Sequence, residues 1–297
     1  MKNILVIGSI NMDLTIHVDK VPLMGETLFG NGFSNQQGGK GANQAVAIKK
    51  MNGNVKMIGA VGDDLYGEQM KDNLKKFGIE YEGFTLEGVS SGVAVITVCN
   101  GDNAIIVDNG ANSELTCELI DTREELFKWA DYVVMQLEIP VETVLHCARK
   151  ANEYGAKVIL NPAPSKEMPD ELYPLIERIV PNEHEAFDIT GIYPEDNESS
   201  VNAVNALRRK GIKEVIITLG ERGCVYTDGD EIVFQPAIKT KAVDTTAAGD
   251  SFIGAFTSGI ANGKTLDEAI KFAAKVSSIT VSRPGASDSI PYADEII

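Results

Sequence analysis

Two carboxylates six residues apart, Asp244 and Asp250, lie near the end of the chain, and an apolar pattern at helical spacing follows the second. Small residues precede Asp250, among them Ala247, Ala248 and Gly249. A helix that begins here offers unpaired backbone N–H groups and the positive end of its dipole, and small residues let a phosphate approach them. An acid at this point can take a proton from an attacking hydroxyl. The stretch predicts an anion hole with a general base; the alternative is an acid that only caps a helix.

A second candidate is the glycine-rich run 37–45, which precedes an alanine-rich helical pattern. Gly39 and Gly41 allow the backbone to approach a polar ligand closely, and Lys40 and Asn43 offer donors. The run is not a Walker A loop, because Lys40 is followed by Gly41 rather than by Ser or Thr. Glycine-rich turns also precede many helices that bind nothing, so the run alone leaves both interpretations open.

Polar residues also follow several predicted strands. They are Asn11, Asp13, Glu138, Asn161, Asn182, Glu185 and Thr218. The carboxyl ends of parallel strands share one edge of a sheet, where open α/β proteins bind ligands. We therefore expect these side chains to converge on one site, although a single Asn or Asp in a loop is more often a turn former.

The elements that would position these residues alternate between strand and helix patterns. Strands are expected at residues 3–8, 55–61, 132–136, 157–161, 179–180 and 215–219, with a hairpin of 224–227 and 231–234. Helices are expected at residues 45–51, 65–77, 141–153, 201–210, 250–262 and 266–281. This alternation predicts an α/β fold with a mostly parallel sheet flanked by helices.

Four further strands interrupt the alternation and have no helices between them. They are expected at residues 14–18, 27–33, 91–99 and 103–108, the last two joined by the turn Asn100-Gly101-Asp102. We expect a single α/β domain over residues 1–297, with a small β-sheet lid inserted at about 11–36 and 91–109. Such a sheet has little core of its own, and pairing of two lids in a homodimer would cover its apolar face.

Composition excludes several classes of protein. The formal net charge of −16 argues against nucleic acid or an anionic membrane as a partner. Four cysteines without CxxC spacing and three histidines without metal-ligand spacing give no metal or redox motif. The start of the chain has neither a G-x-G-x-x-G fingerprint nor a leader pattern. We expect a soluble, cytoplasmic protein whose partners are small molecules.

The motifs together resemble those of the ribokinase-like family of carbohydrate and nucleoside kinases, over nearly the whole chain. The resemblance rests on six ordered segments, at residues 8–13, 38–45, 135–138, 161–164, 181–183 and 244–250. It implies the family's α/β fold with a β lid. It also implies ATP-dependent phosphorylation of the primary 5-hydroxyl of D-ribose, giving D-ribose 5-phosphate and ADP.

The resemblance assigns roles to individual residues. Asp250 would be the general base, and the amides of Ala247, Ala248 and Gly249 would form the anion hole. The sugar would be bound by Asn11, Asp13, Gly39, Lys40, Gly41, Asn43, Glu138 and Asp250. ATP would be bound by Asn182, Glu185, Thr218, Gly220, Glu221, Gly223 and Gly249. Ala274 departs from the pattern, since family members can carry a histidine near adenine at this position.

Two metal ions are implied in the same way. Asn182 and Glu185 would order Mg²⁺ through water, because Mg²⁺ keeps much of its hydration shell. A monovalent cation, usually K⁺, would lie beside the anion hole. Its matching positions are Asp244, Thr246, Thr280, Arg283, Gly285 and Ser289.

Other functions on the same scaffold remain open at this stage. The substrate could be 2-deoxyribose, another sugar or a nucleoside, and a non-catalytic sugar sensor is a further class. The general base argues against a sensor, which would not need one.

Overall fold

The computed structural model describes residues 1–99 and 102–296 and has two main sheets. The larger sheet has nine strands in the order β15-β14-β13-β12-β11-β10-β1-β4-β6, and the smaller sheet has four in the order β3-β2-β8-β9. A further two-stranded sheet pairs β5 (Ala60–Gly62) with β7 (Phe84–Leu86). The α/β fold predicted from the sequence is confirmed.

The large sheet is parallel from β6 to β13 and ends in an antiparallel meander. Its strands are β1 (Asn3–Ile7), β4 (Asn54–Ile58), β6 (Glu80–Tyr81), β10 (Tyr132–Met135), β11 (Lys157–Leu160), β12 (Arg178–Ile179), β13 (Glu214–Thr218), β14 (Cys224–Asp228) and β15 (Glu231–Gln235). The central strands are apolar along their length because helices cover both of their faces. The β14–β15 hairpin agrees with the one predicted from the sequence.

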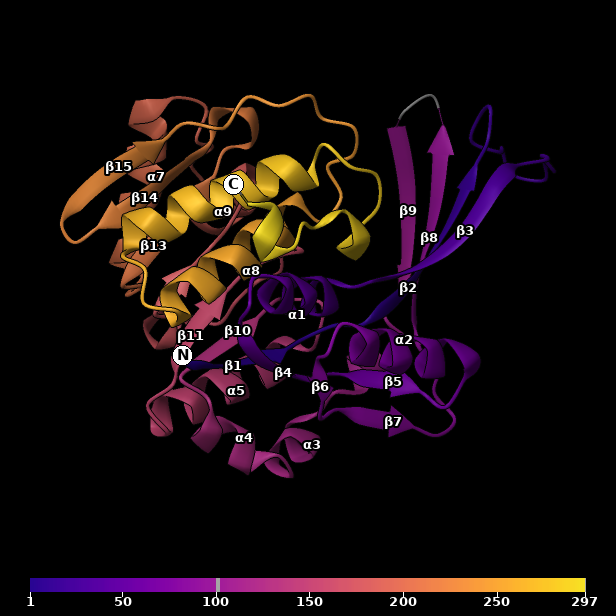
Figure 1. The fold of residues 1–297 in the computed structure, drawn as a ribbon, viewed down its shortest axis with the longest axis horizontal. Coiled ribbons are helices and arrows are strands. Elements are labelled where there is room, and N and C mark those ends of the chain that lie inside the picture. The colour runs from indigo at the N-terminus through magenta and orange to yellow at the C-terminus, as the bar shows by residue number, and fades with distance from the viewer. Residues whose placement is uncertain (100–101, 297) are drawn as a thin grey trace.

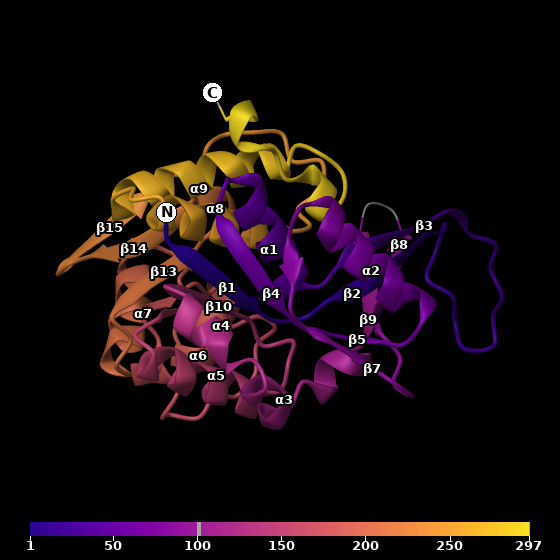
Figure 2. The same cartoon turned by 60° about the horizontal axis from the view of Figure 1, so that its bottom comes forward.

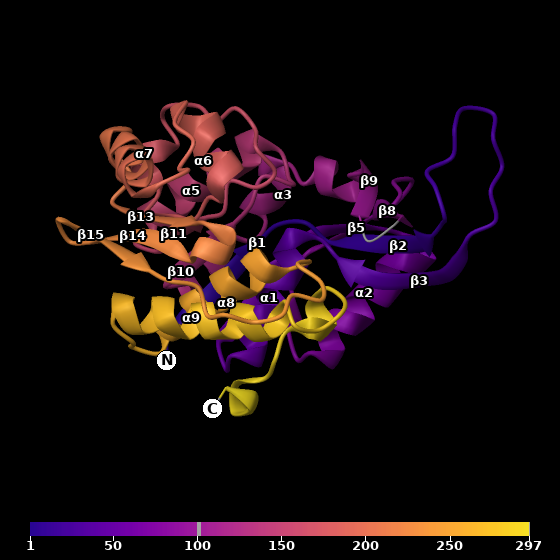
Figure 3. The same cartoon turned by 90° about the horizontal axis from the view of Figure 1, so that it is seen from above.

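Helices pack on both faces of this sheet, as the view along it shows (Figure 3). One face carries α1 (Lys40–Lys50), α8 (Ala248–Ala261) and α9 (Leu266–Thr280), and α8 contacts both of the others. The other carries α3 (Cys117–Asp121), α4 (Glu124–Trp129), α5 (Val141–Glu153), α6 (Glu183–Thr190) and α7 (Asn197–Arg209). Each face has its own core of buried side chains. No helix among residues 1–99 and 102–296 is long and apolar enough to cross a membrane.

The four-stranded sheet projects from the body (Figure 1), and we call it the lid. Its strands are β2 (Asn11–His17), β3 (Asn31–Gly38), β8 (Gly92–Cys99) and β9 (Asp102–Asp108). The central strand β2 pairs with β3 in antiparallel and with β8 in parallel orientation. The loop between β2 and β3 extends beyond the sheet (Figure 2). The predicted turn at 100–102 falls largely on residues outside the described ranges.

Several predicted boundaries were wrong. β2 begins at Asn11 rather than at residue 14, so Asn11 and Asp13 lie on a strand and not in a loop. β3 spans Asn31–Gly38 rather than 27–33, because pairing with β2 fixes its position. The strand expected at 55–61 is two strands in different sheets, separated at Gly59, where an added Cβ would lie 2.9 Å from the Gly8 carbonyl oxygen.

The helix α1 was predicted to begin at residue 45 and begins at Lys40. Gly39 precedes it with φ 86°, a conformation that favours glycine, and this turn directs the chain straight into the helix. The shift places Lys40 and Asn43 in the first turn of α1 rather than in a loop. The short elements β6, β7, α3 and α4 were not predicted. The remaining helix, α2 (Leu65–Lys76), was predicted at residues 65–77.

Candidate active site

The predicted convergence of polar residues occurs at the carboxyl edge of the large sheet. Glu138 follows β10 and accepts hydrogen bonds from Ser9 Oγ, after β1, and from the backbone N–H of Lys40 (2.9 Å). Asn161 follows β11, and its Oδ1 accepts from Gln44 Nε2 on α1 at 3.2 Å. Three strands and one helix are thereby tied together at one place.

The turn before α8 has the geometry of an exposed helix start. Ala247 is the N-cap residue with φ 58° and ψ 11°, and no side chain caps the helix. The N–H of Ala248 donates to the Thr245 carbonyl at 3.2 Å, whereas the next two amides of the first turn, of Gly249 and Asp250, have no intrahelical acceptor. A Cβ added at Gly249 would meet nothing within 4 Å, so the space before the helix is open. This end of α8 can receive an anion.

Asp250 points across to α1 instead of capping its own helix. Its Oδ1 accepts from Gln44 Nε2 at 3.0 Å and its Oδ2 from Asn43 Nδ2 at 3.2 Å, and the residue is 7% exposed. A capping acid would bind N–H groups of its own first turn. The helix-cap alternative is therefore contradicted, and the carboxylate lies beside the uncapped start of α8.

Asp13 is a half-buried carboxylate of the same site. Burial, and after it the charges of Glu138 and Asp250, raise the pKa of Asp13 to about 7. Gly38 leaves room for this side chain, because a Cβ there would lie 2.1 Å from Asp13 Oδ2. A carboxylate so confined gains from hydroxyl donors, which a sugar provides.

Lys40 carries the positive charge among these acids. Burial lowers the pKa of Lys40, but Asp250, Glu138 and Glu185 outweigh burial and raise it. Gly41, next to it, packs so closely that a Cβ would lie 2.7 Å from the backbone carbon of Gly8. The predicted sugar-site residues of α1, β2 and the β10 edge are thus brought together.

Two residues that help to form this part of the site were not predicted. Asn112 donates from Nδ2 to Asn11 Oδ1 at 2.8 Å and accepts the Ile10 N–H at 2.9 Å, so it fixes the start of β2. Ser9 holds Glu138 through its hydroxyl. Ser9 lies within the segment 8–13 that contributes to the family resemblance, whereas Asn112 gave no signal in the sequence.

The predicted nucleotide residues lie at the ends of β12 and β13, except Gly249, which lies in the first turn of α8. The Thr218 hydroxyl donates to the Pro181 carbonyl at 3.4 Å, and a 3₁₀ turn over Gly220–Arg222 follows. Gly223 has φ 101°, and a Cβ there would lie 2.0 Å from the Gln235 carbonyl oxygen. Glu221 is exposed. The loop therefore needs glycine for its shape.

Asn182 and Glu185 form a capping box at the start of α6. Asn182 Oδ1 accepts the Glu185 N–H at 2.9 Å, and Glu185 Oε2 accepts the Asn182 N–H at 2.8 Å. Burial raises the pKa of Glu185, and the charge of Asp250 adds to this. The pair has a structural role that the sequence analysis did not assign, and it also places a buried carboxylate near the site.

The predicted cation residues lie on two segments that hydrogen bonds tie together, since the N–H groups of Val243 and Asp244 both donate to the Val281 carbonyl. Asp244 accepts the N–H of Thr246 and the N–H of Gly285, each at 2.9 Å. These bonds lower the pKa of Asp244 against the opposing effect of burial. Within the described chain, no hydrogen bond joins Asp244 to the other three predicted positions: the side chains of Thr280, Arg283 and Ser289 bind Val276, Glu295 and Ala286.

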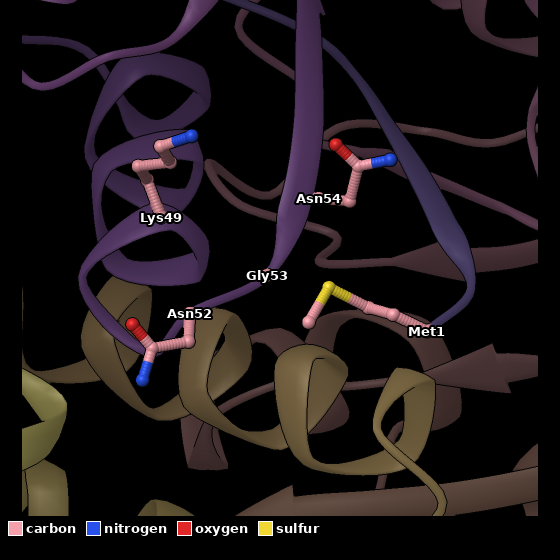
Figure 4. Close-up of a pocket in the computed structure, with 5 residues that line it drawn as sticks. All are labelled: Met1, Lys49, Asn52, Gly53 and Asn54. Carbon is pink, nitrogen blue, oxygen red and sulfur yellow. The ribbon is translucent and has the colours of Figure 1, made fainter.

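A hollow elsewhere on the surface does not belong to this site. Figure 4 shows it, lined by Met1, Lys49, Asn52, Gly53 and Asn54. These residues lie at the amino ends of β1 and β4, whereas the carboxylates described above lie at the carboxyl ends. The hollow holds no acid and no anion hole.

The chain is similar to known sugar kinases along its whole length. A family model described as pfkB family carbohydrate kinase matches residues 1–293. A ribokinase from Schizosaccharomyces pombe is 41% identical over 310 residues, covering 100% of this chain and 97% of the relative. A deoxyribokinase from Salmonella typhi is 37% identical over 296 residues, covering 99% and 97%.

The fold is also similar to solved structures. A structure of ribokinase from Arabidopsis thaliana, complexed with ribose and ATP, superposes with a TM-score of 0.94. It is 31% identical, and the match covers 99% of this chain and 97% of that chain. The lid and the large sheet described above are therefore shared with a protein that holds a pentose and a nucleotide.

Proposed function

Since the chain belongs to the pfkB family of carbohydrate kinases, we propose that it transfers the γ-phosphate of ATP to the primary 5-hydroxyl of D-ribose. The observation that carries the proposal is the position of Asp250, buried and turned toward α1 beside the uncapped start of α8. A base and an anion hole at one point are what transfer of a phosphoryl group to a hydroxyl requires.

The reaction follows from this arrangement. Asp250 takes the proton of the 5-hydroxyl as its oxygen attacks the γ-phosphorus, and the bond to the ADP oxygen breaks. The transition state spreads negative charge over the phosphoryl oxygens, so fixed N–H dipoles at the start of α8 stabilise it. Lys40 adds a positive charge on the sugar side. Asp13, Glu138, Asn11 and Asn43 orient the ring.

Metal ions complete the proposal. Mg²⁺ prefers oxygen ligands, and Glu185 offers a carboxylate. This carboxylate accepts a hydrogen bond from the Asn182 N–H and can accept another from a metal-bound water. When bound, Mg²⁺ neutralises charge on the nucleotide phosphates. Asp244 suits K⁺ because it ties the loop before α8 to Gly285 and is itself only partly buried. Asp244 and nearby backbone carbonyls would hold that ion and keep the anion hole rigid.

The lid supports a homodimer as part of the same proposal. Val95 and Ile106 are neighbours on β8 and β9, 44% and 74% exposed, on the sheet face opposite Asp13. Pairing of two such faces would remove them from water.

An assay over several acceptors tests the proposal. ADP release is measured with ribose, 2-deoxyribose, fructose and adenosine, and the product is identified by ³¹P NMR. We expect the highest kcat/KM with ribose and a 5-phosphate product. A preference for 2-deoxyribose would support the second candidate, which the deoxyribokinase relative favours. Sugar binding without ADP release from any acceptor would leave only a sensor.

A further inference from the structure

A chain of buried amides surrounds Asp250, and none of its members has a role in the proposed function. Gln136 Nε2 donates to Gln44 Oε1 at 2.7 Å, and Gln44 Nε2 donates to both Asp250 Oδ1 (3.0 Å) and Asn161 Oδ1 (3.2 Å). Asn161 Nδ2 donates to the Val180 carbonyl at 3.0 Å. Gln44 and Gln136 are fully buried, and Asn161 is 7% exposed.

The orientation of each amide is fixed by one backbone group. The Val180 carbonyl can only accept, so Asn161 turns its Nδ2 toward it and its Oδ1 toward Gln44. Gln44 must then present Nε2 to Asn161 and Asp250, and Oε1 to Gln136. The end of β12 thus determines that a donor, and not an acceptor, faces Oδ1 of Asp250.

The two oxygens of Asp250 are therefore not equivalent. Both oxygens accept an amide N–H, but the amide of Gln44 at Oδ1 is locked, whereas that of Asn43, which donates to Oδ2 at 3.2 Å, is not, because Asn43 Oδ1 has no partner within the described structure. A hydrogen bond from N–H keeps an oxygen in its acceptor state. Asn43 can turn its unpartnered Oδ1 toward Asp250 and so accept a proton from it, whereas Gln44 cannot, and Oδ2 is therefore the oxygen that can gain a proton.

We propose that Gln44 is a positioning residue for the general base: it holds Oδ1 of Asp250 as an acceptor, so that the sugar proton is taken by Oδ2. The inference rests on the proposed function. The O–H bond of the 5-hydroxyl breaks, the proton joins Oδ2, the oxygen forms its bond to phosphorus, and ADP leaves with the electrons of the broken P–O bond. Gln136 and Asn161 act one step further out, by fixing Gln44.

Two substitutions at Gln44 separate positioning from packing. Gln44→Met keeps the volume and removes the donor, and it should lower kcat about 10- to 100-fold while the ATP KM changes little, as expected for loss of one hydrogen bond to a charged group. Gln44→Glu places a second carboxylate beside the base. Because like charges oppose ionisation, the acid limb of the kcat profile should move up by about one pH unit or more.

The other charged groups near Asp250 are Asp13, Lys40 and Glu185, and all are unchanged in these variants. Asn202→Asp adds the same charge on the exposed side of α7 and is the control, with an unchanged profile expected. A packing role alone would lower Tm and leave the acid limb in place. A folded Gln44→Met protein with wild-type kcat, or a folded Gln44→Glu protein whose acid limb matches the wild type, would overturn the proposal.

A measurement that leaves Gln44 unchanged tests the proposal even if neither Gln44 variant folds, or if ribose is not the substrate. The side-chain amide signals of Gln44 in ¹⁵N NMR should titrate with pH and move when Asp250→Asn is introduced. Gln44 signals that are indifferent to both would refute the positioning role. This readout needs no sugar, so it fails independently of the proposed function.

Discussion

The proposed role of the buried Asp250 as general base can be tested by one substitution. Asp250→Asn keeps the shape and can still bind Gln44, but it cannot accept the hydroxyl proton. Loss of a general base costs about 10²–10⁴-fold in rate, and the loss should fall on kcat with sugar and ATP still bound. ATP affinity can rise slightly, since a negative charge beside the γ-phosphate is removed. Steady-state kinetics and a thermal melt on the same protein suffice; a folded variant with wild-type kcat would contradict the base assignment.

Asp13 should make sugar binding depend on pH near neutrality. Its pKa of about 7 in the folded protein means that the carboxylate, which accepts from hydroxyls, forms as pH rises through 7. We expect the ribose KM to fall between pH 6 and pH 8. The fall should be roughly tenfold if only the ionised form of Asp13 binds ribose, because the ionised fraction rises by about that factor over this range. Asp13→Ala should raise the ribose KM strongly and leave the ATP KM nearly unchanged. If the ribose KM of Asp13→Ala equals that of the wild type, Asp13 has no role in sugar binding.

The same ionisation affects stability with a defined sign. The pKa of Asp13 is higher in the folded chain than its ordinary 3.8, so the folded state binds the extra proton, and the free energy of unfolding falls as pH rises from about 4 to about 7. Asp13→Asn should therefore stabilise the sugar-free protein at pH 8 by roughly 1–4 kcal/mol, and by less at pH 5. Urea unfolding at the two pH values measures this difference. Such a difference would mean that Asp13 lowers the free energy of unfolding at a site where it is needed to bind the sugar.

At the scale of elements, the lid should respond to sugar. Its strand β2 carries Asn11 and Asp13, while the outer strands β3 and β9 have exposed side chains and no second layer over them. Ribose bound to Asp13 would draw β2 toward the large sheet, so amide exchange in β2, β3, β8 and β9 should slow. Strand β13, already buried, is the internal reference. Lid exchange that is the same with and without saturating ribose would exclude closure.

The loop before α8 should make activity depend on potassium. Asp244 binds Thr246 and Gly285, so a cation held there would steady the backbone of the anion hole without touching substrate. Rates should be higher in K⁺ than in a bulky organic cation at matched ionic strength, and Asp244→Asn should weaken this difference. Asp170→Asn, whose side chain is 97% exposed, is the control. Equal rates in both salts would remove the cation from the proposal.

Elements with a clear apolar period could be predicted, and those set by their neighbours could not. The apolar pattern predicted both ends of α5 (Val141–Glu153) correctly, because one face of that helix is buried and the other is not. In contrast, α1 starts within a glycine-rich run of low helix propensity, and its packing against α8 and β4 supplies the contacts that favour the helix there. The position of β3 was missed for a similar reason, since pairing decides it.

The site divides in the same way. Residues that could do chemistry by type, such as Asp13, Glu138 and Asp250, could be predicted from their place after strands and before a helix. Gln44 and Gln136 could not be predicted, although they lie within the segments 38–45 and 135–138, because an amide has a role only through the groups that it contacts. Asn112, far along the chain from Asn11, needed the fold to bring it there.

At the scale of the whole molecule, the net charge of −16 opposes association, whereas the exposed apolar face of the lid would favour it under our proposal. Charge repulsion between copies is screened at about 8–10 Å in physiological salt, so the apolar contact should prevail there and weaken at low ionic strength. Sedimentation velocity should find a dimer at micromolar concentration in 0.15 M salt. Ile106→Glu should give a monomer, because it buries a charge between the two lids. Ile238→Glu, at a residue 44% exposed outside the lid, is the matched control and should remain dimeric. A wild-type monomer, or equal behaviour of the two variants, would show that the lid face serves another purpose.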